Sequence, residues 1–323
     1  MNNGVFVISL DYEMMWGAIF NEKVKSGYLY RTKYIEESVN ELLLLLKRYH
    51  IHATWASVGL IACTGKDEAL IMADHNVKDP YSDLRLSDFI KSIDDNDYYR
   101  YFSPDSLLKI SDTEGQEIAT HTFSHFYLKE HKNALEVIES EIQKSKNVLE
   151  QLTGLTVKTL IMPKNQVSKN LRIYMKKCSI SIIRGVQVSA RFNKRTKLFK
   201  LLHFMDAYLP VCGDSCYELS EIKDGDIYNV RASAFWRTYY SKLWFLEPLK
   251  LVRIKHQLKK AALSGKVFHL WFHPHNLSQN YKRNLKEFEK ILKYYQKLSK
   301  KYGMLSCNMS DCVELYFKEN DNG

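Results

Sequence analysis

Four short segments of this sequence carry side chains that can bind a metal ion or transfer a proton. They are Asp11 with Glu13, His121 with His125, the segment 163–166, and His273 with His275. Two imidazoles and one carboxylate form many catalytic zinc sites, which keep one coordination position open for water or substrate. The sequence therefore predicts a divalent metal centre with Glu13, His121 and His125 as candidate ligands.

The spacing within these segments supports a shared site. Asp11 and Glu13 are two residues apart, so both side chains leave the same face of an extended strand. His121 and His125 are four residues apart, which would place both imidazoles on one face of a helical turn. Pro274 stiffens the chain that follows an apolar run, so His273 is a candidate proton donor.

Each segment taken alone also has a structural explanation. Two nearby carboxylates occur at solvated strand exits and in the first turns of helices. Histidines four residues apart occur by chance on exposed helices. His273 and His275 could be hydrogen-bonded structural histidines. The prediction of one site therefore depends on where all four segments lie relative to the strands.

The polar segments follow short apolar runs that are typical of buried strands. Strands are expected at 5–10, 52–58, 117–120, 157–162, 180–183 and 266–272, with a weaker one at 227–233. Helices are expected at 35–49, 134–152, 171–177, 240–262 and 283–300. Strands that alternate with helices predict a parallel sheet covered by helices, and active sites assemble at the carboxyl ends of such strands.

The chain has 323 residues and shows neither an internal repeat nor a low-complexity linker. One closed α/β barrel domain over residues 1–323 is therefore expected. The polar stretch 66–101 and the stretch 190–245, which lacks a clean period, are predicted to be insertions at the barrel rim.

The formal net charge is +10, from 47 Lys and Arg against 37 Asp and Glu. The densest basic stretches, 194–200 and 282–301, favour a solvated face over nucleic-acid binding, because lysines recur there at helical intervals. Attraction to anionic substrates or to an anionic membrane surface stays open.

The longest apolar runs fall far short of the roughly 18 residues that span a bilayer, and Asp11 interrupts the first of them, so a cytoplasmic protein is expected.

Six cysteines are scattered along the chain, which predicts reduced thiols rather than a disulfide framework. Cys212 and Cys216 could hold a metal, but a zinc ribbon needs a second close pair, and Cys307 and Cys312 have the wrong interval. No oligomeric state follows from the sequence.

Five segments taken in order resemble the motifs of the polysaccharide deacetylase (NodB-homology) family. They are 9–17, 53–59, 117–125, 162–166 and 269–276, and the His-Thr-x-x-His spacing in the third is the most specific. The resemblance implies a distorted barrel of seven or eight β/α units that removes an N-acetyl group from a sugar or surface-glycan precursor. It also implies one divalent metal ion, with Zn²⁺ expected and Co²⁺ or Mn²⁺ as alternatives.

The resemblance further implies a role for each polar residue. Asp11 would be the general base, His273 the general acid, and Glu13, His121 and His125 the metal ligands. The backbone N–H after Pro163 would help to stabilise the oxyanion. Candidate substrate contacts are Tyr12, Trp16, Pro163, Lys164, Asn165, Trp271 and His275, although the aromatic residues among them could equally belong to the core.

Two departures from the family pattern stand out. The usual metal-binding aspartate directly follows the catalytic one, whereas here Tyr12 intervenes before Glu13. The usual arginine two residues before the proline is replaced by Ile161, and Lys164 or Arg231 is expected to supply the missing charge.

The missing arginine motivates an alternative, a catalytically silent barrel that binds a glycan or a partner. A glycoside hydrolase with Asp11 and Glu13 as its carboxylate pair is less favoured. Retaining chemistry needs carboxyl groups about 5 Å apart across a bond, which neighbours on one strand hardly provide.

Overall fold

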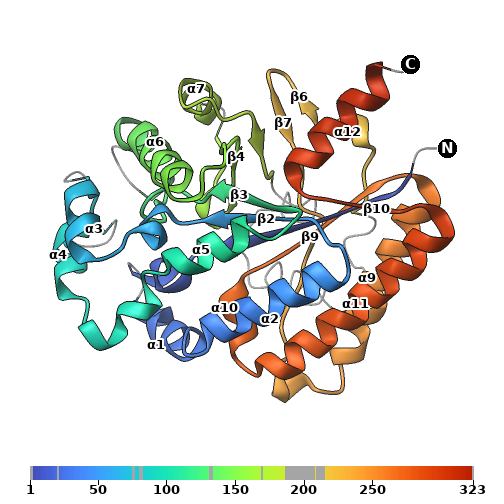
Figure 1. Cartoon of the computed structure of the whole chain (residues 1–323), viewed down its shortest axis with the longest axis horizontal. Coiled ribbons are helices and arrows are strands. Elements are labelled where there is room, and N and C mark those ends of the chain that lie inside the picture. The colour runs from blue at the N-terminus through green and yellow to red at the C-terminus, as the bar shows by residue number, and fades with distance from the viewer. Residues whose placement is uncertain are drawn as a thin grey trace.

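A computed structural model describes residues 3–19, 22–74, 77–79, 83–130, 134–168, 170–185, 208 and 215–321. Its centre is a ten-stranded sheet in the order β6-β7-β5-β4-β3-β2-β1-β9-β8, with β10 paired to β1 (Figure 1). The strands are β1 Val5–Tyr12, β2 Ala53–Ser57, β3 Gln116–Thr120, β4 Thr159–Leu160, β5 Ile182–Ile183, β6 Lys223–Asp224, β7 Ile227–Asn229, β8 Ala234–Phe235, β9 Val267–Phe272 and β10 Leu305–Cys307. All the pairings are parallel except that of β6 with β7.

The parallel strands curl into a half-barrel, and the chain between β7 and β8 bridges its two edges. β7 pairs with β5, whereas β8 pairs with β9. Between them, Val230 N donates to Ile183 O at 2.9 Å and Ser233 N donates to His269 O at 2.8 Å. One segment therefore contacts both β5 and β9, which lie toward opposite ends of the sheet, and the predicted distorted barrel is confirmed.

Helices surround the sheet in Figure 1. The α-helices are α1 Glu22–Arg31, α2 Ile35–Arg48, α3 Lys66–Met72, α4 Leu86–Ser92, α5 Pro104–Ser111, α6 Ala134–Thr153, α7 Leu171–Lys177, α9 Glu247–Ser264, α10 Pro274–Ser278, α11 Tyr281–Tyr302 and α12 Met309–Asp321. Short 3-10 helices are η1 Met14–Ala18, η2 Gly59–Ala62, η3 Asp95–Arg100, η4 Pro163–Asn165, η6 Leu219–Ile222 and η7 Ser241–Leu243. Among the described helices, none combines the length and apolar character needed to cross a membrane.

Side chains of β1 alternate between two apolar clusters, as the period of an extended strand requires. Even-numbered residues such as Phe6 and Ile8 pack in the larger cluster, which includes the buried faces of the helices. Val5 and Val7 pack in the smaller cluster inside the barrel. The odd-numbered residues Asp11 and Glu13 continue this inner face toward the carboxyl end of the sheet.

Several elements differ from those predicted. The helix expected at 240–262 begins at Glu247, because Pro248 suits a first helical turn but not a helix interior. Residues 66–101, which are predicted to be a rim insertion, contain α3, α4 and η3. Residues 190–207 and 209–214 of the second predicted insertion lie outside the described part of the chain, and so does Cys212 of the predicted cysteine pair. The described cysteines are free thiols.

Glu117 joins three strands to a helix at the amino end of the barrel. Its carboxylate accepts hydrogen bonds from Thr54 Oγ1 at 2.6 Å and from Thr159 Oγ1 at 2.5 Å, on β2 and β4. It also accepts bonds from Ser310 Oγ at 2.6 Å and from the backbone N–H groups of Met309 and Ser310. A carboxylate at these first N–H groups of α12 is favoured by the helix dipole as well as by hydrogen bonding.

We expect Glu117→Ala to lower the free energy of unfolding by about 2–4 kcal/mol, because several donors lose one charged acceptor. Glu117→Gln should lose less, since its amide oxygen still accepts hydrogen bonds. Urea denaturation of the three proteins measures the difference. A loss below about 0.5 kcal/mol for Glu117→Ala would show that this carboxylate does not hold α12 to the sheet.

Candidate metal and catalytic site

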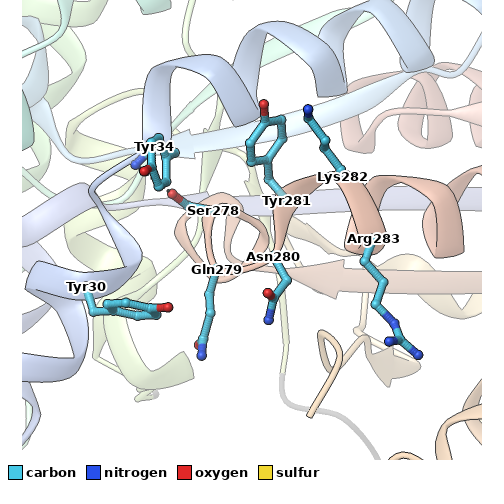
Figure 2. A pocket seen from close by; sticks show the side chains of 8 residues that line it. All are labelled: Tyr30, Tyr34, Ser278, Gln279, Asn280, Tyr281, Lys282 and Arg283. Carbon is cyan, nitrogen blue, oxygen red and sulfur yellow. Dashed lines mark hydrogen bonds between the residues drawn. The ribbon is translucent and has the colours of Figure 1, made fainter. Parts of the chain in front are cut away.

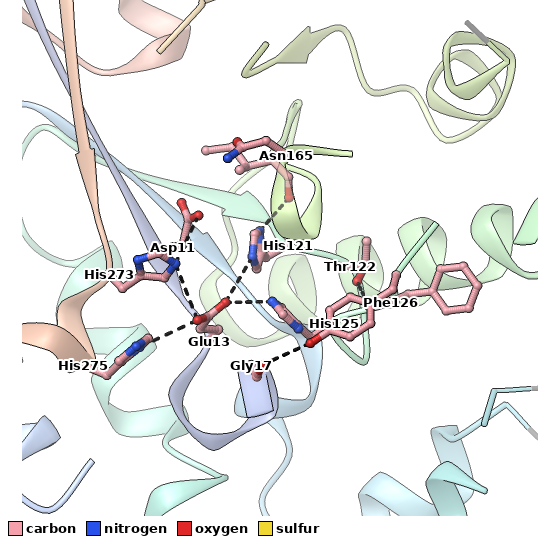
Figure 3. Close-up of polar contacts among 12 residues, drawn as sticks. Asp11, Glu13, Gly17, His121, Thr122, His125, Phe126, Asn165, His273 and His275 are labelled. Carbon is pink, nitrogen blue, oxygen red and sulfur yellow. Dashed lines mark hydrogen bonds and ion pairs between the residues drawn. The ribbon is translucent and has the colours of Figure 1, made fainter. Parts of the chain in front are cut away.

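Three strands deliver the candidate catalytic residues to one place at their carboxyl ends (Figure 3). Asp11 lies near the end of β1 and Glu13 directly follows it. His121 follows β3, and His273 follows β9. The carboxylates and the imidazoles face one another in the barrel interior, as the strand-end rule predicts.

Glu13, His121 and His125 form a buried three-residue cluster. One ligand atom from each residue lies within 4.8 Å of the other two. Glu13 Oε2 is 2.7 Å from His125 Nε2 and 3.6 Å from His121 Nε2. His121 donates from Nδ1 to the carbonyl oxygen of Ile161 at 2.6 Å, which leaves Nε2 as its ligand atom. Such an outer hydrogen bond is typical of metal-binding histidines.

The charges in this cluster fit a divalent cation. Burial would raise the pKa of Glu13, but its electrostatic interactions with the imidazoles of His273 and His125 outweigh burial and hold that pKa well below its usual range. Burial lowers the pKa of His125, which favours the neutral imidazole that binds metals. Nε2 of His125 is buried and close to Glu13, yet it is not aligned for a hydrogen bond. Within the described residues, the ion pairs of Glu13 are all with histidines.

The loop between the two histidine ligands is not the helical turn that their spacing suggested. Thr122 and His125 have positive φ angles of 64° and 61°, and the loop has no regular secondary structure. Ser124 donates from its backbone N at 2.8 Å and from Oγ at 3.0 Å to the carboxylate of Glu141 on α6. Glu141 is fully buried, which raises its pKa to about 7. The loop therefore owes its shape to a helix that packs behind it.

Asp11 is held by Arg184, which directly follows β5. Arg184 Nη1 and Nη2 donate to the two oxygens of Asp11 at 2.6 and 2.8 Å. Burial would raise the pKa of Asp11, but the guanidinium of Arg184 outweighs it and lowers the pKa. The same guanidinium donates to Ser9 Oγ at 2.9 Å and to Asn165 Oδ1 at 2.9 Å. These four bonds fix the orientation of the candidate base.

The expectation that Lys164 or Arg231 supplies the missing charge was wrong. Lys164 Nζ donates to Glu130 Oε1 at 3.0 Å, and Arg231 donates to Glu221 Oε2 at 2.6 Å. Both cations therefore already have carboxylate partners away from Asp11. Arg184 comes one residue after the strand predicted at 180–183. Because polar residues directly after parallel strands are candidates for the active site, its position in the sequence already marks Arg184 as a candidate.

A polar chain supports Arg184 from inside the barrel. His269 Nε2 lies 2.7 Å from Ser9 Oγ, and its Nδ1 lies 3.2 Å from the carbonyl oxygen of Val230. Burial lowers the pKa of His269 to about 3, so the ring is neutral. With the proton on Nδ1, Nε2 accepts from Ser9, whose oxygen in turn accepts from Arg184. Sequence analysis assigned no role to His269 or Ser9.

His273 and Trp271 form the solvent-accessible side of the site. His273 Nε2 is 3.8 Å from Asp11 Oδ2 and 3.6 Å from Glu13 Oε1, and its side chain is 20% exposed. The half-buried Trp271 ring lies 4.4 Å from the guanidinium carbon of Arg184 and 5.6 Å from the centre of the His273 ring. A substrate would therefore reach the carboxylates past these two side chains.

The remaining candidate residues have different surroundings. Tyr12 and Trp16 are fully buried in the outer core, where Tyr12 packs edge-on against Trp55, so the structure does not bring them to the site. Even-numbered residues of β1 face the helices, which explains the position of Tyr12. His275 is buried, with its pKa lowered by burial to about 3, and its ring packs against Tyr28. Pro163 is buried and opens the turn that carries Asn165.

A cavity of about 550 Å³ lies beside α10, the helix that starts directly after His273 (Figure 2). Its lining consists of tyrosines, small polar residues and two cations, namely Tyr30, Tyr34, Ser278, Gln279, Asn280, Tyr281, Lys282 and Arg283. No acidic side chain belongs to this lining. The cavity is therefore an aromatic and basic part of the surface near the carboxyl end of the barrel.

The sequence profile of the polysaccharide deacetylase family matches residues 26–183. The matched part contains both candidate histidine ligands and ends one residue before Arg184. A search of curated proteins found no match for this sequence.

Three solved structures are similar to this chain. A Mycobacterium smegmatis protein, provisionally named a polysaccharide deacetylase, is 12% identical, with a TM-score of 0.63 over 99% of this chain and 92% of the other. A Pseudomonas aeruginosa PAO1 protein with the same provisional name is 13% identical, with a TM-score of 0.55 over 98% and 91%. Puue allantoinase is 12% identical, with a TM-score of 0.56 over 96% and 89%. At these identities the likeness concerns the fold alone.

We expect Arg184→Met to lower the free energy of unfolding by about 3–5 kcal/mol, because it leaves the carboxylate of Asp11 buried without a partner. Adding Asp11→Asn should recover part of that loss, since the orphaned charge disappears. A double-mutant cycle by urea denaturation measures the coupling between the two side chains. If the losses of the two single variants sum to the loss of the double variant within about 0.5 kcal/mol, the result would contradict a fixed ion pair between Arg184 and Asp11.

Proposed function

We propose that this chain, whose residues 26–183 match the polysaccharide deacetylase family, is a metal-dependent hydrolase that removes an N-acetyl group from a sugar or surface-glycan precursor. The observation that carries this proposal is the meeting of a Glu13, His121 and His125 cluster with the Asp11–Arg184 pair. Glu13, His121 and His125 would hold a divalent ion, expected to be Zn²⁺, which when bound supplies a Lewis acid for the amide carbonyl and the attacking water. A cytoplasmic location stays a prediction.

Asp11 acts as the general base in this proposal. Arg184 keeps the carboxylate ionised and fixes its plane, while each oxygen retains a lone pair that can accept a proton from water. The bond from Arg184 to Asn165 ties the base to the turn at 163–165, where Lys164 and Asn165 have positive φ angles of 53° and 50°. The backbone N–H after Pro163 stays a proposed donor to the developing oxyanion.

His273 acts as the general acid. Its imidazole lies beside both carboxylates and is the partly exposed member of the group, so it can meet the leaving nitrogen of an amide that enters from solvent. Trp271, which packs against His273, offers an aromatic face to a sugar ring at the same opening. Proton donation from His273 Nε2 would release the free amine.

The alternative of a catalytically silent barrel was based on the missing arginine at position 161. Arg184 pairs with Asp11 instead, so this reason no longer favours a silent barrel. The glycoside hydrolase alternative stays disfavoured, because four imidazoles lie within 4 Å of the carboxylate of Glu13. A carboxylate so enclosed lacks the open side that attack on a glycosidic bond needs. An amide hydrolase therefore accounts best for both carboxylates.

The metal centre predicts a specific pattern of metal content. The purified protein should contain about one equivalent of a divalent ion of the zinc type, and His121→Ala should contain almost none, because a three-ligand site loses one ligand. His256→Ala is the matched control, since His256 is an exposed histidine on α9. Elemental analysis of the three proteins tests this. Equal metal in His121→Ala and the control would place the ion elsewhere.

The base and acid assignments predict losses of activity with the metal still bound. Asp11→Asn and His273→Gln should each reduce acetate release from N-acetylglucosamine oligomers by about 10²–10⁴-fold, as expected when a general base or acid is lost. Chelation should abolish acetate release, and added Zn²⁺ should restore it. Acetate release that survives complete metal removal, or an undiminished rate in Asp11→Asn, would refute the mechanism.

A further inference from the structure

The two oxygens of the Glu13 carboxylate have different neighbours. Oε2 faces the candidate metal ligands, at 2.7 Å from His125 Nε2 and 3.6 Å from His121 Nε2. Oε1 accepts a 2.7 Å hydrogen bond from the hydroxyl of Tyr28, a residue of α1. His273 also lies on the side of Oε1, at 3.6 Å. The carboxylate is thus oriented with one oxygen toward the cluster and one oxygen turned away from it.

The position of the Tyr28 hydroxyl follows from close packing on two sides. The Tyr28 ring packs against the His275 ring, with centroids 4.5 Å apart and planes inclined by 37°. On the other side lies Gly17 of η1. A Cβ atom at Gly17 would come within 2.6 Å of Glu13 Oε1 and 2.9 Å of Tyr28 Cε1. A residue without a side chain at position 17 therefore lets the phenol and the carboxylate approach each other.

We propose that Tyr28 is a positioning residue that occupies Oε1 of Glu13 and thereby limits Glu13 to one ligand oxygen. A carboxylate can bind a metal through one oxygen or through both. A hydrogen-bond donor on one oxygen favours binding through the other, and loss of such an outer partner typically costs metal affinity. A single oxygen from Glu13 leaves more of the coordination sphere for water and substrate. This inference rests on the metal-binding part of the proposed function and not on the identity of the substrate.

The test compares Tyr28→Phe with Tyr30→Phe, a matched change at an exposed tyrosine on the same helix, which is 61% exposed. Both variants keep their aromatic ring, so the packing against His275 is preserved in Tyr28→Phe. Metal-free protein is titrated with Co²⁺ against a chromophoric chelator, and the visible spectrum of the Co²⁺ form is measured. These readouts do not require turnover.

Tyr28→Phe should bind Co²⁺ about 10–100-fold more weakly than the wild type. Its visible absorption should also weaken, because a second oxygen from Glu13 raises the coordination number. Tyr30→Phe should match the wild type in both readouts. Unchanged affinity and spectrum in Tyr28→Phe, or equal weakening in both variants, would overturn the role of Tyr28. A wild-type protein that binds no Co²⁺ would overturn the metal centre itself, which is a separate result.

Discussion

The burial of two carboxylates at the end of one strand is the constraint around which the carboxyl end of this barrel is built. Asp11 and Glu13 are 4% and 3% exposed. A buried carboxylate is tolerated only where positive charge or hydrogen-bond donors compensate it. Arg184 compensates Asp11 through two hydrogen bonds. Glu13 has imidazoles and one phenol around it, so a divalent cation is the natural complement of its charge.

The barrel interior holds two buried polar networks with different partners. At the amino end, Glu117 connects three strands to the start of α12. Apolar side chains, among them Val7, Ala119, Ile161 and Ile182, pack together inside the barrel as well. A second polar network runs from His269 through Ser9 to Arg184 and ends at Asp11. The first network therefore links α12 to the sheet, and the second orients the candidate base.

Strand ends and side-chain alternation could be read from the sequence, and they placed Asp11, Glu13, His121 and His273 together. The family pattern could not identify the arginine that pairs with Asp11. In that pattern the arginine occupies the position of Ile161, which follows β4, whereas Arg184 follows β5. Tyr28 escaped prediction because α1 lacks a clear apolar period. The shape of the 121–125 loop depends on Glu141, a contact between distant segments that local spacing does not reveal.

The central claim is that Glu13, His121 and His125 together bind one divalent ion beside Asp11. A crystal structure of protein purified without added metal, with anomalous data on both sides of the zinc absorption edge, tests it most directly. The account predicts one anomalous peak at about 2.0–2.2 Å from a Glu13 oxygen and the Nε2 atoms of both histidines. Well-ordered imidazoles turned away from Glu13, with no peak between them, would contradict it.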